Sequence, residues 1–149
     1  MGYGLPAAIG ASVGSAREFD DKKPVWLIDG DGSFQMTSEE LAAAFLDHAP
    51  VKIAILNNSV YGMVRQWQTT FYEKRYSDTD PHRKTDFVKL AEAFGAKGYR
   101  ATTPAEFKVA FADAMKQHGP SWIDCRIGKD EKVLPMIPGG GTIEDIIME

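Results

Sequence analysis

The sequence of 149 residues lacks the features that mark several large classes of protein. It has one cysteine, so no disulfide within the chain can stabilise it. With no signal-peptide pattern either, the expected location is a reducing one, the cytoplasm or an organelle of a eukaryote. Its apolar runs fall far short of the roughly 20 residues that cross a membrane. Lysine and arginine total 17 against 21 acidic residues, a net charge of −4, which argues against a nucleic-acid partner.

Three common ligand-binding patterns are also missing or incomplete. No Gly-Lys-Ser/Thr follows a glycine-rich turn, which excludes a Walker phosphate loop. The segment from Gly2 to Ala7 imitates a dinucleotide fingerprint, but no strand precedes it and Pro6 interrupts it, which argues against an NAD site. The three histidines lack metal-ligand spacing, and Cys125 lies within an expected strand, where a buried structural thiol is expected.

The chain does contain 44% hydrophobic residues, arranged as short β-branched segments that alternate with longer segments of helical period. This pattern predicts one α/β domain, a three-layer, mainly parallel sheet with helices on both faces. The expected strands are 25–29, 51–56, 96–100 and 121–127. The expected helices are 6–17, 41–48, 87–94 and 104–118. A polar surface loop is expected at 77–84 and an irregular tail, rich in proline and glycine, at 129–149.

Two of the expected helices begin with the residues of an N-terminal capping box. In 37–40 and in 103–106, a threonine is followed three residues later by a glutamate, so each side chain can bond an otherwise unpaired backbone N–H. Pro104 at the first helical position strengthens the second case. We predict that a helix opened by Thr37 starts near the edge of the sheet, where its dipole favours an anion if it points inward.

Two polar residues follow successive expected strands. Asp31 lies between two glycines after the first strand, and Asn58 follows the second strand 27 residues later. A right-handed crossover makes such strands parallel and usually adjacent, so both side chains emerge at the carboxyl edge, where open α/β sheets bind ligands. Carboxylate and amide oxygens suit Mg²⁺. Gly30, Gly32 and Ser33 suit an approaching phosphate, so the pattern predicts a diphosphate held through Mg²⁺.

Each member of this pair also has a plainer interpretation. An aspartate between glycines is often only a strand-to-helix turn, and Asn57-Asn58 is a frequent loop dipeptide. The residue types alone leave these structural roles open. The proposed metal site depends on the two side chains converging.

The sequence resembles a known family in several segments. Gly30-Asp31-Gly32-Ser33, the 24 residues from Ser33 to Leu56, and Asn57-Asn58 together resemble the thiamine-diphosphate motif. Segments 1–11, 61–68 and 133–138 are similar to the catalytic subunit of the acetolactate synthase (acetohydroxyacid synthase) family, so the likeness runs from end to end. The resemblance implies that residues 1–149 form the thiamine-diphosphate- and Mg²⁺-binding domain, the C-terminal part of a longer enzyme.

The resemblance also implies roles for particular residues. The implied magnesium ligands are Asp31, Asn58 and the backbone carbonyl of Val60. The implied cofactor contacts, with Met1 supporting the pyrimidine ring, are Met1, Gly30, Asp31, Gly32, Ser33, Asn58, Val60, Tyr61, Gly62 and Met63. The residues implied at the substrate channel are Met63, Val64 and Trp67, with Trp67 associated with selection of the acceptor. On residue type alone, a core or interface role stays open for Met63 and Trp67.

Members of the family condense two pyruvates, or pyruvate and 2-oxobutyrate, with loss of CO₂ in branched-chain amino-acid biosynthesis. The implied cofactors are thiamine diphosphate and Mg²⁺, with FAD and the activating glutamate on other domains. The resemblance therefore implies no catalytic residue in this chain and no activity of the chain alone. It also implies a homo-oligomer, a dimer or tetramer, to which a regulatory subunit can bind. Two alternatives stay open: another thiamine-diphosphate carboligase or decarboxylase of 2-oxo acids, and a non-catalytic binding or assembly module.

Overall fold

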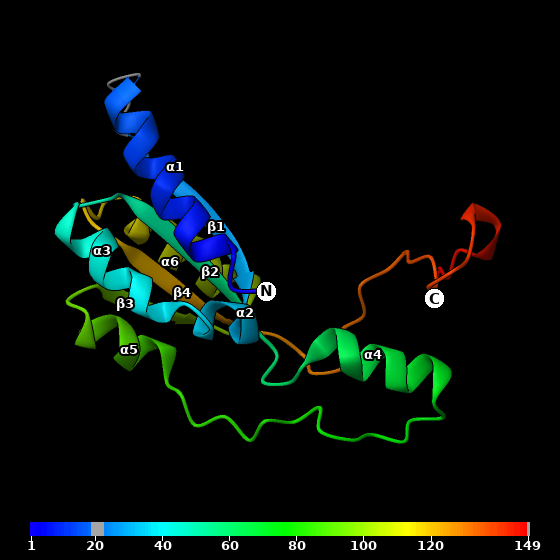
Figure 1. Cartoon of the computed structure of the whole chain (residues 1–149). Helices are drawn as coiled ribbons and strands as arrows, with labels where there is room; N and C mark the ends of the chain where they lie inside the picture. The colour runs from blue at the N-terminus through cyan, green and yellow to red at the C-terminus, as the bar shows by residue number, and fades with distance from the viewer. Residues whose placement is uncertain (19–22, 149) are drawn as a thin grey trace.

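A parallel sheet of four strands forms the centre of the fold in the computed structural model, which describes residues 1–18 and 23–148 (Figure 1). The strands are β1 (Val25–Gly30), β2 (Val51–Asn57), β3 (Lys97–Ala101) and β4 (Ser121–Arg126). Their order across the sheet is β1-β2-β4-β3, and every adjacent pair is parallel. The expected parallel sheet is therefore confirmed, and each strand lies within one residue of its predicted limits.

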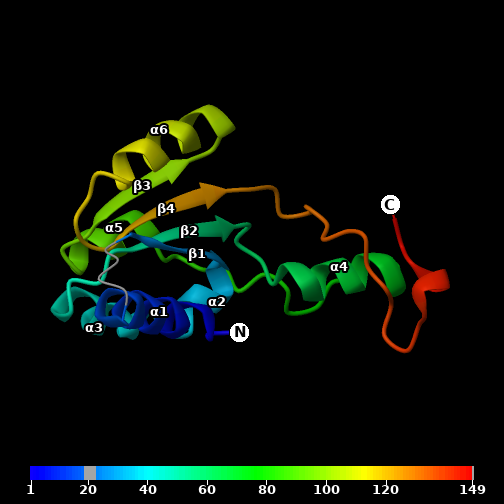
Figure 2. The same ribbon diagram turned by 90° about the horizontal axis from the view of Figure 1, so that it is seen from above.

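Helices cover both faces of this sheet, as expected for a three-layer domain. The elements on one face are α1 (Gly4–Glu18), α2 (Asp31–Gln35), the 3₁₀ turn η1 (Ser38–Glu40), α3 (Leu41–Leu46) and α5 (Phe87–Ala93). The other face is covered by α6 (Pro104–Ala114), which Figure 2 shows across the strands from α1 and α3. Within the described ranges, no helix is long and apolar enough to cross a membrane.

The main core lies between the sheet and the helices α1, α2, α3 and α5. β2 and β4 are buried along nearly their whole length because helices lie on both of their faces. Phe34 of α2 packs against Phe87 of α5 and Trp122 of β4, with ring centroids 5.8 and 5.9 Å apart. The Trp122 indole N–H donates to the Phe87 carbonyl at 2.7 Å. This cluster fixes α2 and the start of α5 on the sheet.

One of the two expected capping boxes is absent at the N-terminus of α3. The Thr37 hydroxyl donates to the Gly2 carbonyl at 3.0 Å and makes no capping bond to the helix. The prediction is wrong because the Thr37 hydroxyl is oriented toward the Gly2 carbonyl, a partner distant in sequence, and a 3₁₀ turn rather than an α-helix follows Thr37. At α6, Thr103 accepts from the Glu106 N–H at 3.2 Å as predicted, while the Glu106 carboxylate accepts from Thr102. The helix that starts at the carboxyl edge is α2, which the sequence pattern does not predict.

Helix α4 (Gly62–Phe71) and the tail after β4 lie together and extend away from the sheet (Figures 1 and 2). Helix α4 is not among the expected helices. Gln66, buried in this helix, donates from Nε2 to the Val133 carbonyl at 3.1 Å and accepts from the Val133 N–H at 2.7 Å. The tail also contains the 3₁₀ turn η2 (Ile143–Asp145). The Gln66 side chain thus bonds both the N–H and the carbonyl of Val133 and fixes the tail against α4.

Candidate functional site

The two polar residues expected at the site follow neighbouring strands. β1 ends at Gly30, and Asp31 is the first residue of α2. β2 ends at Asn57, directly before Asn58. β1 and β2 pair directly and in parallel, so both strand ends reach the same edge of the sheet. Asp31 also lines a cavity of about 210 Å³ together with Asn57 and Ser59. The expected adjacency of the two strand ends is confirmed.

Asp31 has a buried carboxylate whose charge is balanced by an arginine. Only 3% of the residue is exposed, and its Oδ2 forms an ion pair with Nη1 of Arg83, in the loop before α5. Burial raises the pKa of the Asp31 carboxyl above its usual value, although the Arg83 guanidinium acts in the opposite direction. A carboxylate buried this deeply needs a cationic partner, and a metal ion can serve as well as a guanidinium.

The loop after β2 is held in one conformation by its own asparagines. Asn57 Oδ1 accepts from the Ser59 N–H and hydroxyl, both at 3.1 Å, and Asn58 Oδ1 accepts from the Val60 N–H at 3.2 Å. Ser59 has a φ of 61°, in the left-handed region that costs a non-glycine residue about 1–2 kcal/mol. A Cβ on Gly62 would lie 2.6 Å from Nδ2 of Asn58. Only glycine therefore leaves the Asn58 side chain in place.

Met1 and Tyr61 lie beside Gly32 at the start of α2. A Cβ built on Gly32 would lie 3.7 Å from the Met1 methyl group and 3.6 Å from the Tyr61 ring. Ser33 Oγ accepts from the Gly2 N–H at 3.0 Å, which fixes the N-terminal segment against α2. The structure thus brings together Met1, Gly32 and Tyr61, three of the expected cofactor residues, and the missing side chain of Gly32 leaves its backbone accessible between the other two.

The residues expected beside a substrate channel lie on α4 and are largely exposed. Met63 is 49% exposed, Val64 50% and Trp67 39%. The Trp67 ring packs edge-on against Phe71, with centroids 5.2 Å apart. Figure 1 shows α4 beyond the edge of the sheet. This exposure argues against a core role for the three residues, and their place at a substrate channel stays a prediction.

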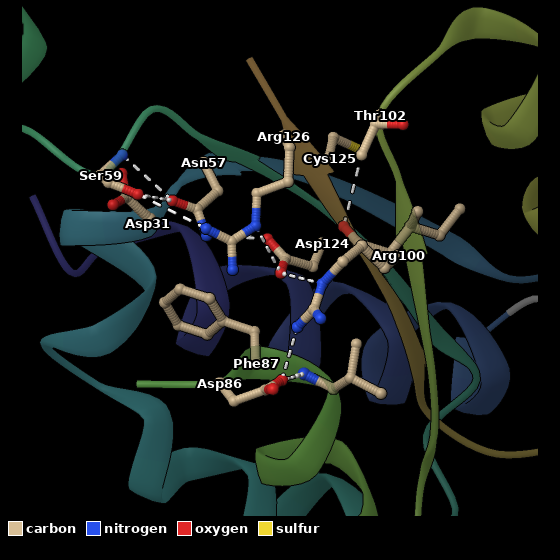
Figure 3. A network of polar contacts seen from close by, with 12 residues as sticks. Asp31, Asn57, Ser59, Asp86, Phe87, Arg100, Thr102, Asp124, Cys125 and Arg126 are labelled. Atoms are coloured by element: carbon tan, nitrogen blue, oxygen red, sulfur yellow. Dashed lines mark hydrogen bonds and ion pairs between the residues drawn. The ribbon is translucent and has the colours of Figure 1, made fainter. Parts of the chain in front are cut away.

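Two parts of this edge are not evident from the sequence pattern. Loop 77–84, expected only as a surface loop, contains buried Thr79, whose carbonyl accepts from the Tyr61 N–H at 2.9 Å, and carries Arg83 into the site. The second part is Asp124, which is fully buried in β4 (Figure 3). A lone acidic residue within an apolar strand is the signal that could have identified Asp124. No comparable signal identifies Arg83.

A larger cavity, of about 570 Å³, lies near the opposite ends of the strands. Lys52 lines it, and burial lowers the pKa of this lysine to about 8. Its Nζ donates to the carbonyls of Gln117 and Gly119 at 2.7 and 2.6 Å. These bonds explain Lys52 as an anchor for the turn between α6 and β4. We therefore place the candidate site at the carboxyl edge.

Comparison with known proteins identifies the family of this chain. Residues 1–125 match the family described as "Thiamine pyrophosphate enzyme, C-terminal TPP binding domain". Because this match covers most of the sequence, the chain belongs to that family. The expected fold and cofactor class are confirmed together by the sheet and by this match.

Within this class, the sequence is similar to acetolactate synthases along nearly its whole length. It is 44% identical to "Acetolactate synthase" of Mycobacterium leprae, over 98% of this chain and 23% of that protein. It is 46% identical to "Acetolactate synthase catalytic subunit, mitochondrial" of Saccharomyces cerevisiae, over 99% of this chain and 20% of that protein. Among solved structures, the thiamine diphosphate-dependent 4-hydroxybenzoylformate decarboxylase of Rhodococcus jostii aligns with a TM-score of 0.75 at 34% identity, over 86% of this chain and 23% of that chain. The chain thus spans less than a quarter of the length of each of these relatives.

Proposed function

We propose that this chain is the thiamine-diphosphate- and Mg²⁺-binding part of an acetolactate synthase. In the complete enzyme it would take part in condensing two pyruvates, or pyruvate and 2-oxobutyrate, with loss of CO₂. The observation that carries the proposal is the buried Asp31 at the same sheet edge as Asn58, in a chain 44–46% identical to acetolactate synthases. The product class would be precursors of branched-chain amino acids.

The donor set at this edge fits Mg²⁺. Asp31 offers a buried carboxylate that already holds a cationic group, the guanidinium of Arg83. Asn58 offers an amide oxygen and Val60 a backbone carbonyl, and Mg²⁺ prefers hard oxygen ligands of these kinds. Gly62 preserves the place of Asn58, because a side chain there would collide with it. We assign Asp31, Asn58 and Val60 as the metal ligands on these grounds.

The chain's own residues would bind and orient the cofactor. Thiamine diphosphate supplies, when bound, the carbon centre at which 2-oxo acids react and the ring system that delocalises negative charge. The residues proposed to contact the diphosphate are Gly30, Gly32 and Ser33. Those proposed along the rest of the cofactor are Met1, Tyr61, Gly62 and Met63, and those toward the substrate are Met63, Val64 and Trp67.

Other requirements of the reaction would be met outside these 149 residues. The activating glutamate and FAD would be held by other domains, and the complete site would form in a homo-oligomer, with a regulatory subunit as a further partner. The exposed apolar side chains of α4 are consistent with such contacts. The proposed location is the cytoplasm, or an organelle in a eukaryote.

The proposal predicts that thiamine diphosphate binds this chain in a Mg²⁺-dependent way. Isothermal titration of thiamine diphosphate should give saturable binding with Mg²⁺ present and at least about tenfold weaker binding after EDTA removes the metal. The reason is that the diphosphate would be linked to Asp31 and Asn58 mainly through the ion. Thiamine without phosphates is the matched control, and Mg²⁺ should not strengthen its binding. Equal affinity for thiamine diphosphate with and without Mg²⁺ would remove the metal from the proposed site.

The chain alone is expected to form no acetolactate from pyruvate above the uncatalysed background. The residues proposed here bind and orient the cofactor, whereas the group that activates it would come from another domain. A colorimetric assay of acetolactate, run at saturating cofactor and Mg²⁺, tests this expectation. Measurable turnover by the chain would place the activating group among these 149 residues and overturn the assignment.

A second candidate is a decarboxylase of 2-oxo acids that uses the same cofactor. The 34% identity to the hydroxybenzoylformate decarboxylase of Rhodococcus jostii supports it. The identity to acetolactate synthases is higher and covers more of the chain. Product analysis of the complete enzyme with pyruvate separates the two, because a synthase releases acetolactate and a decarboxylase releases acetaldehyde.

A further inference from the structure

A buried acidic residue outside the proposed ligand set organises the loop after β2. Asp124 lies in β4 with no exposed surface. Its Oδ1 accepts from Nδ2 of Asn57 at 2.8 Å. Its Oδ2 accepts from Nε of Arg100 at 3.2 Å and from Nε of Arg126 at 3.0 Å (Figure 3). Burying a charge in a sheet is costly, and here both carboxylate oxygens are satisfied by donors from β2, β3 and β4 itself.

The Asp124 carboxylate decides which way the Asn57 amide faces. A carboxylate paired with two guanidinium groups offers only acceptors, so it must meet the NH₂ end of the amide. The oxygen end then faces Ser59, where it accepts from the backbone N–H and from the hydroxyl. A reversed amide would set donor against donor at the Ser59 backbone N–H and acceptor against acceptor at Asp124. Asn57 is itself 3% exposed, so water cannot easily replace either bond.

Ser59 stands between the two proposed ligands of this loop. Its left-handed φ of 61° is disfavoured for serine, and the two bonds to Asn57 Oδ1 hold it there. Arg126 adds a longer contact from Nη1 to the Ser59 hydroxyl at 3.5 Å. The backbone direction at Ser59 sets where the Asn58 side chain and the Val60 carbonyl can point.

We propose that Asp124 is a positioning residue for the metal site. By fixing the Asn57 amide it keeps Ser59 left-handed and presents Asn58 and Val60 together for Mg²⁺. This inference rests on the proposed function, because it takes these two residues as ligands. Asp124 is not one of the proposed ligands. Its direct link to this loop is the Asn57 amide, and Arg126 provides a second, longer one to the Ser59 hydroxyl. Such outer supports of metal ligands are commonly worth about 10–100-fold in metal affinity.

The test exchanges the two buried side chains. Asp124→Asn should raise the Mg²⁺ concentration that gives half-maximal binding of thiamine diphosphate by about tenfold or more. The new amide turns its single oxygen to the guanidinium groups of Arg100 and Arg126, so its NH₂ group faces the Asn57 NH₂ group. Asn57→Asp should do the same, because two carboxylates then face each other. The double variant Asn57→Asp/Asp124→Asn has the original net charge. It again places an acceptor opposite Ser59, and it restores one hydrogen bond between the side chains at positions 57 and 124 of β2 and β4. Its Mg²⁺ dependence should return to within about threefold of the unmodified chain.

A matched control separates positioning from general stability. Arg100→Gln removes two bonds of the same network, to Asp124 and to Asp86, but leaves the Asn57 contact intact. It should lower the urea midpoint while changing the Mg²⁺ dependence less than twofold. The inference is overturned if a folded Asp124→Asn variant keeps the original Mg²⁺ dependence, if the folded exchange variant shows no recovery, or if Arg100→Gln loses as much affinity.

A measurement without any ligand distinguishes this inference from the proposed function. The Ser59 amide donates to Asn57 Oδ1, so its hydrogen exchange should speed up about tenfold or more in Asp124→Asn and slow again in the exchange variant. Unchanged Ser59 exchange in the folded variants would end the inference even if the chain binds thiamine diphosphate. If the exchange pattern holds but the unmodified chain shows no Mg²⁺-dependent binding, the proposed function fails and the metal role of Asp124 fails with it.

Discussion

Replacing Trp122 by alanine is expected to lower the free energy of unfolding by about 4 kcal/mol or more. The indole is fully buried, and removing a buried tryptophan costs about 3–5 kcal/mol through lost contacts and the cavity left behind. The substitution also removes the indole hydrogen bond to the Phe87 carbonyl, which adds about 1 kcal/mol. Because domains of this kind are stable by only about 5–15 kcal/mol, this loss is a large fraction of the total stability. Urea denaturation followed by far-ultraviolet circular dichroism measures the loss.

Trp122→Phe separates the two contributions. It keeps an aromatic ring against Phe34 and removes only the indole N–H and part of the volume. The expected loss is about 1–2 kcal/mol, clearly smaller than for alanine. Alanine and phenylalanine variants with the same urea midpoint as the unmodified chain would show that this ring cluster does not hold α2 and α5 on the sheet.

The strands could be predicted from the sequence because their signal is local. β2 reads as a nearly continuous apolar run, and a strand buried on both faces requires that pattern wherever its neighbours come from. The ends of β1 and β2 follow from the same apolar runs, so the sequence alone places Asp31 and Asn58 at one edge of the sheet. The parallel order then follows from the helix between the strands.

The features that escaped prediction depend on partners distant in sequence. The Thr37 hydroxyl has the sequence context of a helix cap, yet it donates its hydrogen bond to the Gly2 carbonyl, 35 residues away. Arg83 lies in a polar loop whose composition indicates only exposure, and its ion pair with Asp31 depends on how that loop crosses the sheet edge. Helix α4 packs mainly on the tail rather than on the sheet, so it lies outside the alternation of strands and helices from which the fold was predicted. Local periodicity carries no information on such contacts.

The ion pair at the sheet edge predicts that Asp31→Asn and Arg83→Gln change Mg²⁺ affinity in opposite directions. Asp31→Asn removes the charged ligand and should weaken Mg²⁺-dependent binding of thiamine diphosphate by about 100-fold or more. Arg83→Gln removes the guanidinium that occupies the same carboxylate, so Mg²⁺ no longer displaces a partner and its affinity should rise several-fold. Titration of Mg²⁺ at fixed thiamine diphosphate measures both changes.

The free energy of unfolding without ligand should change differently from Mg²⁺ affinity in these variants. This contrast identifies the ion pair between Asp31 and Arg83 as the cause of both changes. Each single variant leaves a buried charge unpaired and should lose about 3–5 kcal/mol of unfolding free energy. The double variant Asp31→Asn/Arg83→Gln removes both charges, so it should regain much of that stability while its Mg²⁺ binding stays as weak as that of Asp31→Asn. A double variant that binds Mg²⁺ as well as the unmodified chain would show that Asp31 is not a metal ligand. An Arg83→Gln variant with weakened binding would instead show that Arg83 supports the bound diphosphate rather than competing for the carboxylate.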